Sequence, residues 1–217
     1  YAGNDRADIA VWSVATGAFL VNANSAVTAA ARKLAPVKEV FPRSTGGVRH
    51  YLKAIRAYQW AKNLLVFVPL LTAHTWNDTD SVVRACLAFM AFSLSASSIY
   101  VLNDLLDLTS DRNHPRKRRR PFASGDLSIL QGLMLIPILA VIGLAAGTFL
   151  GLNFLLVLLV YLTITIAYSF RLKSYVLIDV GVLASLYTTR VIGGGAAGSL
   201  LSSFLFLAFF PLLFLCF

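Results

Sequence analysis

The segment VVRACLAFMAFSLSASSIYVLN, residues 82–103, is followed directly by DLLDLTSDRNHPRKRRRPFASG, residues 104–125. The first part is mostly apolar and has about the 20 residues that a helix needs to cross a bilayer. The second part begins with carboxylates and continues with a run of basic side chains. Together they predict a membrane-spanning helix that carries charges of both signs at one of its ends.

The composition of the whole chain is that of a membrane protein. Of its 217 residues, 58% are hydrophobic and 13% are charged, and the mean hydropathy is +0.73. We therefore predict an all-α fold, a polytopic membrane helical bundle. We expect the membrane as a partner, and no nucleic acid. The predicted spans are 58–75, 82–103, 128–149, 152–170, 174–197 and 202–217.

The positions of Lys and Arg predict the orientation of these spans. Nine of them fall in residues 1–62, six in the loop 104–127 and two in the turn 171–173. The other short loops, which alternate with these, contain none. Cytoplasmic segments of membrane proteins are enriched in Lys and Arg. We therefore expect a chain integral to the plasma membrane, with its N-terminus and the charged loop in the cytoplasm.

Four polar side chains mark the end of the second span. On a continuous helix, at about 100° per residue, Asn103, Asp104, Asp107 and Asp111 fall within one arc. Three carboxylates crowded together at low dielectric repel one another unless a cation is present. Mg²⁺ takes a few carboxylates together with phosphate oxygens and water. The four residues are therefore candidate ligands of a Mg²⁺ that holds a diphosphate. The alternative is a solvated helix end whose acids pair with nearby arginines.

The basic run 116–120 follows these acids. Part of it is expected to anchor the chain against anionic lipid. Guanidinium groups beside a metal site can also bind phosphate oxygens. We therefore predict substrate-binding roles for Lys117, Arg118 and Arg120.

The charged segment resembles the first aspartate-rich motif of the UbiA superfamily of intramembrane prenyltransferases, N-D-x-x-D-x-x-x-D followed by a basic stretch that ends in R-P. YSFRLK, residues 168–173, is similar to the Tyr/Lys motif of that family, and RAYQWAKN, residues 56–63, is similar to its opening helix. The resemblance implies a Mg²⁺-dependent transferase with a diphosphate leaving group. It implies catalytic roles for Asp104, Asp107, Asp111 and Lys173 and substrate-binding roles for Lys62, Asn63 and Tyr168.

The residues after the last aspartate indicate a branch of the family. HPRK, residues 114–117, completes the pattern D-x-x-H-P-x-K-x-x-R-P, which resembles the decaprenyl-phosphate phosphoribosyltransferase branch. That resemblance implies phosphoribosyl transfer from phosphoribosyl pyrophosphate to a polyprenyl phosphate. One alternative is a prenyltransferase that moves a prenyl group from prenyl diphosphate to an aromatic or other lipid-soluble acceptor. Another is a transporter fragment, although transporter ion sites tend to lie at the membrane midplane.

The family resemblance also implies nine transmembrane helices, with a second aspartate-rich motif after the sixth. We therefore expect residues 51–217 to form a partial UbiA-type domain with about six of the nine helices. The sequence ends inside the sixth, so we interpret the chain as truncated and expect the fragment itself to be inactive.

The N-terminal residues have a soluble character. Residues 1–35 resemble the end of a haloacid-dehalogenase-type phosphatase domain, with Asp5 and Asp8 in place of its last acidic motif. We expect a strand at 19–21, a helix at 26–34, and a linker over 36–50, which contains proline and glycine.

Two features of the predicted fifth span need separate interpretation. Arg190 lies inside an apolar helix, where an arginine is costly and is a functional candidate. It either binds substrate or pairs with another helix. Gly193–Gly195 predicts close helix packing in preference to a phosphate-binding loop, because no strand precedes it and no Lys-Ser/Thr follows.

Overall fold

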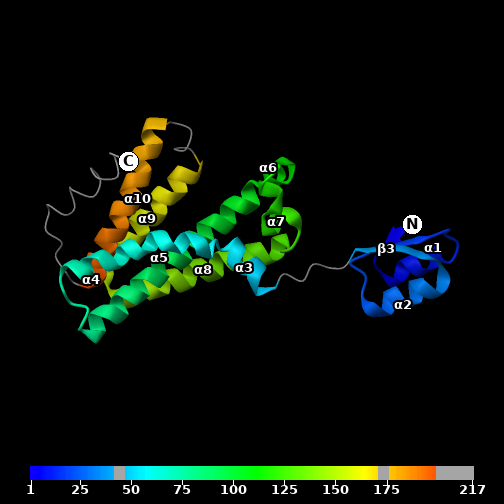
Figure 1. The fold of residues 1–217 in the computed structure, drawn as a ribbon, viewed down its shortest axis with the longest axis horizontal. Coiled ribbons are helices and arrows are strands. Elements are labelled where there is room, and N and C mark those ends of the chain that lie inside the picture. The colour runs from blue at the N-terminus through cyan, green and yellow to red at the C-terminus, as the bar shows by residue number, and fades with distance from the viewer. Residues whose placement is uncertain (42–46, 171–175, 199–217) are drawn as a thin grey trace. The chain divides into compact units, whose positions relative to one another are not determined.

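The computed structural model describes residues 1–41, 47–170 and 176–198 (Figure 1). The chain divides into two compact units, Tyr1–Gly47 and Val48–Phe217. The first unit combines short strands and helices, and the second is helical. Lys173 and the predicted span 202–217 lie outside the described residues.

The N-terminal unit is a three-stranded parallel sheet in the order β1-β2-β3. Its core contains Trp12, Leu20 and Val27, each almost completely buried, so the helices cover the sheet with apolar side chains. The strand and the helix expected at 19–21 and 26–34 are confirmed. The elements are β1 (Ala2–Gly3), η1 (Arg6–Asp8), α1 (Ile9–Trp12), β2 (Ala18–Val21), α2 (Ser25–Leu34) and β3 (Val37–Phe41).

Strand β3 lies in the range 36–50, which we expected to be a linker. Pro36 restricts the residue before it to extended backbone, and β3 continues in that conformation to pair with β2. The range is therefore strand at its start, and helix α3 begins at Val48.

The two aspartates of the proposed phosphatase remnant have local structural roles. The Asp8 carboxylate accepts hydrogen bonds from the backbone N–H groups of Asp5 at 3.0 Å and Asn4 at 2.7 Å. These bonds hold the pKa of Asp8 below its usual value. Asp5 in turn caps η1. Both side chains thus stabilise the turn after β1, and the phosphatase resemblance stays a prediction.

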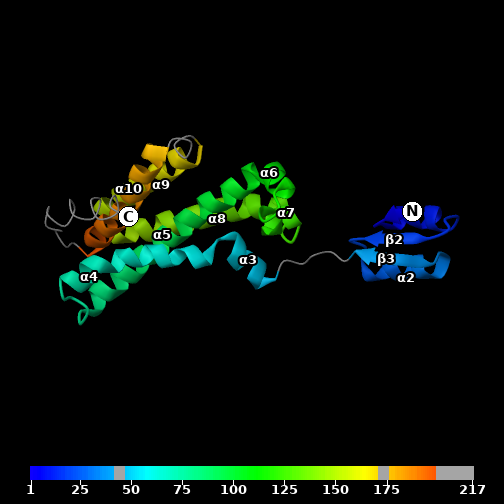
Figure 2. The same cartoon turned by 45° about the horizontal axis from the view of Figure 1, so that its top comes forward.

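The C-terminal unit is built around the long helix α5, which lies beside α8 over much of its length (Figure 2). Phe92, Phe154 and Tyr161 form the centre of its largest apolar core, where their rings meet edge to face. Its elements are α3 (Val48–Ala54), η2 (Ala57–Phe67), α4 (Val68–Thr72), α5 (Thr79–Leu106), α6 (Leu108–Asn113), η3 (Lys117–Arg119), α7 (Pro121–Ser124), α8 (Ile129–Leu150), α9 (Leu152–Phe170) and α10 (Val176–Ala197).

Three helices among the described residues are long and apolar enough to cross a membrane: Thr79–Leu106, Ile129–Leu150 and Leu152–Ser169. They confirm the second, third and fourth predicted spans. The first predicted span, 58–75, is instead a 3₁₀ segment followed by the short helix α4, which begins near Pro69. Proline has no backbone N–H and is tolerated best in the first turn of a helix, which is where Pro69 lies in α4. The segment is thus helical from Ala57 to Thr72, in two consecutive elements.

Serines of α5 hold η2 against that helix. Trp60 Nε1 donates to Ser97 Oγ at 3.1 Å, and Asn63 Nδ2 donates to Ser93 Oγ at 2.9 Å. Because the two serines are four residues apart, they lie on one face of α5. This face fixes η2 and the residues that η2 carries.

The glycines of α10 allow that helix to approach η2 closely. A Cβ atom on Gly194 would collide with the backbone carbonyl of Val66, and one on Gly193 would collide with the ring of Phe92. The glycine run therefore serves helix packing, as predicted.

Candidate active site

Helix α5 ends at Leu106, and Asp107 separates it from α6. The backbone of Asp107, at φ −85° and ψ 7°, leaves the helical region. The continuous helix assumed for the sequence prediction is therefore interrupted between Asp104 and Asp111. As a consequence, the acidic side chains do not form the single face that we expected.

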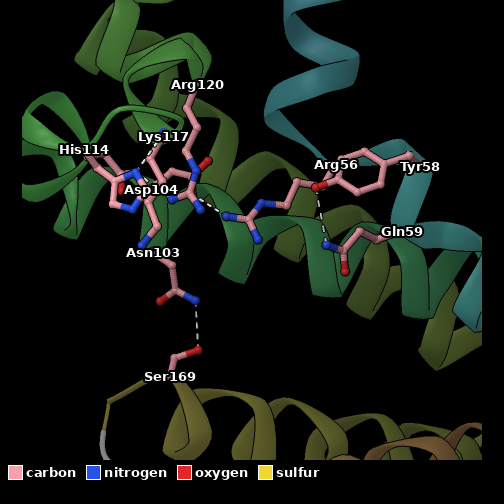
Figure 3. Close-up of polar contacts among 10 residues, drawn as sticks. Arg56, Tyr58, Gln59, Asn103, Asp104, His114, Lys117, Arg120 and Ser169 are labelled. Atoms are coloured by element: carbon pink, nitrogen blue, oxygen red, sulfur yellow. Dashed lines mark hydrogen bonds and ion pairs between the residues drawn. The ribbon is translucent and has the colours of Figure 1, made fainter. Parts of the chain in front are cut away.

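Asp104 and Asp111 are both buried and are joined by one guanidinium group. Arg120 Nη1 donates to Asp104 Oδ1 at 3.0 Å and to Asp111 Oδ2 at 2.6 Å. Arg56 Nη2 adds a third bond, to Asp104 Oδ1, at 2.6 Å (Figure 3). The alternative of acids paired with arginines thus describes these two carboxylates. Their assignment as metal ligands stays a prediction.

Arg56 reaches Asp104 from an unusual backbone conformation. It lies between α3 and η2 with φ 51°, in the left-handed region that non-glycine residues seldom adopt. The energetic cost of such a residue is about 1–3 kcal/mol, and strain of this kind is concentrated at functional sites. The guanidinium also stacks 4.9 Å from the ring centroid of Tyr100.

Asn103 and Asp107 line a cavity of ≈ 320 Å³, which we call the first cavity. Asn103 points away from Asp104 toward α9, where its Nδ2 donates to Ser169 Oγ at 2.8 Å (Figure 3). Within the described residues, the Asp107 carboxylate makes no side-chain hydrogen bond or ion pair. The first cavity therefore contains one carboxylate and one amide from the predicted motif. Its lining also includes Arg56, Gln59, Lys62, Tyr100, Arg120, Tyr161, Thr165, Tyr168, Ser169, Leu183, Leu186, Tyr187 and Arg190.

Arg190 supplies a buried positive charge to the wall of the first cavity; the residue is 5% exposed. Its Nε donates to Asn63 Oδ1 at 2.7 Å, and its Nη2 donates to the hydroxyl of Tyr161 at 3.0 Å. The guanidinium lies 4.9 Å from the Tyr161 ring centroid and 5.4 Å from that of Tyr187. In the described part of the chain, no carboxylate pairs with it. An anionic ligand in the cavity would provide the missing counter-charge.

The other predicted residues fall into three groups. Lys62 and Tyr168 line the first cavity. Asn63 is buried and orients Arg190, so it acts behind the cavity wall. Lys117 and Arg118 are exposed in η3 and line neither of the two polar cavities.

Arg56 and Gln59 are wall residues that the sequence reasoning missed. Both lie in the stretch RAYQWAKN, where the family resemblance implied roles only for Lys62 and Asn63. Only the tertiary structure indicates their role, because Arg56 donates a hydrogen bond to Asp104, which is 48 positions away in sequence.

Comparisons with known proteins identify the family of the chain. The model of the UbiA prenyltransferase family matches residues 64–217. Among curated relatives, an uncharacterized protein, y4nM, of Sinorhizobium fredii is 37% identical over 195 residues, which are 89% of this chain and 38% of the relative. The decaprenyl-phosphate phosphoribosyltransferase of Mycobacterium tuberculosis is 38% identical over 150 residues, 67% of this chain and 50% of that enzyme. The chain thus spans about half or less of the length of these relatives.

A solved structure shares the fold. A UbiA homolog from Archaeoglobus fulgidus, bound to DMAPP and Mg²⁺, aligns with a TM-score of 0.66 at 20% identity over 76% of this chain and 60% of that one. The family match covers well over half of the chain, including α5, the charged loop, α9 and α10, whereas the lining residues Arg56, Gln59 and Lys62 precede it. The chain belongs to the UbiA prenyltransferase family.

Proposed function

We propose that the protein is an integral membrane, Mg²⁺-dependent transferase whose donor leaves as diphosphate. We propose further that it transfers phosphoribosyl from phosphoribosyl pyrophosphate to a polyprenyl phosphate. One observation carries the proposal: Asp107 and Asn103 share a cavity with Arg190, a buried cation that has no carboxylate partner in the described residues. Oxygen atoms that could bind a metal and a cation that could bind phosphate thus line the same cavity.

The donor set fits a magnesium ion that arrives with its substrate. Among the described residues, no group of three or more His, Cys, Asp or Glu side chains could hold a metal alone. Mg²⁺ is often held by one or two carboxylates, with substrate phosphates and water completing its shell. Asp107 and the amide oxygen of Asn103 would hold the ion in the first cavity. When bound, Mg²⁺ would stabilise the negative charge of the departing diphosphate.

The basic side chains of the first cavity complement the negative charge of the diphosphate. Arg190 cannot lose its proton and is already oriented by Asn63 and Tyr161, so it needs no rearrangement when an anion develops. Lys62, whose Nζ lies 3.4 Å from Gln59 Oε1, contributes a second cation. These groups would bind the diphosphate oxygens and favour their release.

The transfer itself is a balanced displacement at the anomeric carbon of ribose. The bond from that carbon to the diphosphate oxygen breaks, and the diphosphate keeps the electron pair. A phosphate oxygen of the polyprenyl phosphate forms the new bond. Because that phosphate is already ionised near neutral pH, the step needs no general base. The protein contributes positioning and electrostatics.

The choice of donor is supported by the relatives. The protein from M. tuberculosis, 38% identical to this chain, is named for phosphoribosyl transfer to decaprenyl phosphate. The distribution of Lys and Arg supports a plasma-membrane location with the first cavity on the cytoplasmic side.

A comparison of two donors tests the proposal. Membranes that contain the full-length protein and a polyprenyl phosphate are incubated with labelled phosphoribosyl pyrophosphate, and in parallel with a labelled prenyl diphosphate and an aromatic acceptor. We expect Mg²⁺-dependent label in the lipid only from the phosphoribosyl donor. Label only from the prenyl donor would assign the protein to the prenyltransferase alternative, and label from neither would refute the proposed activity.

A further inference from the structure

A second polar cavity shares Arg56 and Arg120 with the first. It has a volume of ≈ 420 Å³, and we call it the second cavity. Asp104, which is 3% exposed, is its only acidic lining residue among those described. The lining residues are Lys53, Arg56, Tyr58, Gln59, Asp104, Arg119, Arg120 and Pro121.

The second cavity has an excess of positive charge. Asp104 already accepts hydrogen bonds from both Arg56 and Arg120, so its charge is neutralised within the wall. The side chains of Lys53 and Arg119 have no ion pair in the described residues, and both are exposed. The second cavity is therefore a basic pocket with cations available for an anion, a combination suited to a phosphate group.

The two cavities are adjacent. Arg56, Gln59 and Arg120 line both of them, so these side chains form a shared wall. Arg56 and Arg120 are fixed in this wall because each is bound to a buried carboxylate. A molecule with an anionic group at each end could therefore place one group in each cavity and its middle beside the wall.

We propose that the second cavity is a monophosphate subsite, which binds the 5-phosphate of phosphoribosyl pyrophosphate while the diphosphate occupies the first cavity. The inference rests on the proposed function. It gives a physical basis for donor choice. A prenyl diphosphate carries no phosphate group apart from its diphosphate, so its apolar chain would leave the cations of this subsite unpaired. Lys53 and Arg119 are then specificity-determining residues.

The test uses Lys53→Gln and Arg119→Gln in the full-length protein. Arg116→Gln is the matched control, since Arg116 is exposed in the same basic loop and lines neither polar cavity. Each of the two variants is expected to raise KM for phosphoribosyl pyrophosphate about tenfold, the loss of one hydrogen bond to a charged group at an exposed site. The KM for polyprenyl phosphate should not change, and the control should resemble the wild type.

Two inhibitors separate the subsites. Ribose 5-phosphate carries only the monophosphate, and its inhibition constant should rise with KM in Lys53→Gln and Arg119→Gln. Inorganic pyrophosphate should inhibit these variants and the wild type equally. If ribose 5-phosphate inhibits all of them alike, or if the KM of the polyprenyl phosphate rises instead, the assignment of the second cavity is wrong.

A lipid headgroup is the other source of a phosphate for the same cations. The assay is therefore repeated in vesicles of zwitterionic lipid with and without anionic lipid. We expect the tenfold effect in both. An effect that occurs only with anionic lipid would identify a headgroup site and overturn the donor subsite. Phosphoribosyl transfer with unaltered kinetics in both variants would refute this inference alone, whereas prenyl transfer without phosphoribosyl transfer would refute the proposed function.

Discussion

Asn63 of η2 and Arg190 of α10 are joined by a hydrogen bond of 2.7 Å across 127 positions of sequence. Both residues are buried, and Asn63 is also held by Ser93 of α5. The bond connects three elements at the wall of the first cavity. It fixes the orientation of the buried cation that is proposed to meet the diphosphate.

Replacing Asn63 with Ala should therefore lower turnover through Arg190. The variant leaves the Arg190 Nε without its acceptor, at a cost of about 1–3 kcal/mol for an unsatisfied buried group. We expect Asn63→Ala and Arg190→Met to have non-additive effects on kcat in a double-mutant cycle, because residues that share one interaction are coupled. Leu64→Ala, at an exposed neighbouring position, is the control. Additive effects would show that Asn63 does not act through Arg190.

Replacing Asp107 with Asn should remove activity and leave the fold intact. Its carboxylate makes no ion pair in the described residues, so its loss leaves no buried cation unpaired. We expect kcat to fall about 100-fold or more and the concentration of Mg²⁺ needed for half-maximal rate to rise. Asp80→Asn, which removes only a surface pair with Arg84, should behave as wild type. Normal Mg²⁺ dependence in Asp107→Asn would exclude the proposed metal role.

Replacing Arg120 with Ala should destabilise the helical unit. The change leaves Asp111 without the guanidinium that pairs with it and removes one of the two guanidinium partners of Asp104, and both carboxylates are buried. Loss of one partner of a buried ion pair costs about 3–5 kcal/mol, and a partly exposed arginine should give the lower end of that range. The measurement is thermal unfolding in detergent, with Arg118→Ala as the exposed control. Equal melting temperatures for the two variants would contradict the bridging role.

Replacing Gly194 with Ala should also destabilise the unit, because the added methyl group collides with the carbonyl of Val66. Overpacking of this kind costs about 1–3 kcal/mol. Gly181→Ala, on the same helix, places its methyl group in open space and is expected to be neutral or stabilising by about 0.5–1 kcal/mol. Similar melting temperatures for the two alanine variants would show that η2 and α10 can separate at little cost.

Several features of the molecule could be predicted from sequence because they depend on local composition. Apolar length located α5, α8 and α9 to within a few residues. The motif at Asn103–Gly125 identified the family and the end of α5 at which the cavities lie. Hydropathy located the first span, 58–75, but did not detect its division into a 3₁₀ element and the short helix α4.

Tertiary structure decided which aspartates pair with arginine and which one faces the first cavity. A helical projection assumes that the helix continues, and the turn at Asp107 breaks that assumption. Asp104 and Asp111 are buried against Arg56 and Arg120, and Asp107 faces the first cavity. The sequence by itself determined the membrane helices, the family and the residue types at the site, since these follow from composition and short motifs. Which carboxylates are paired and which face the cavity depends on contacts between distant residues, such as Arg56 with Asp104, and only the folded chain brings these together.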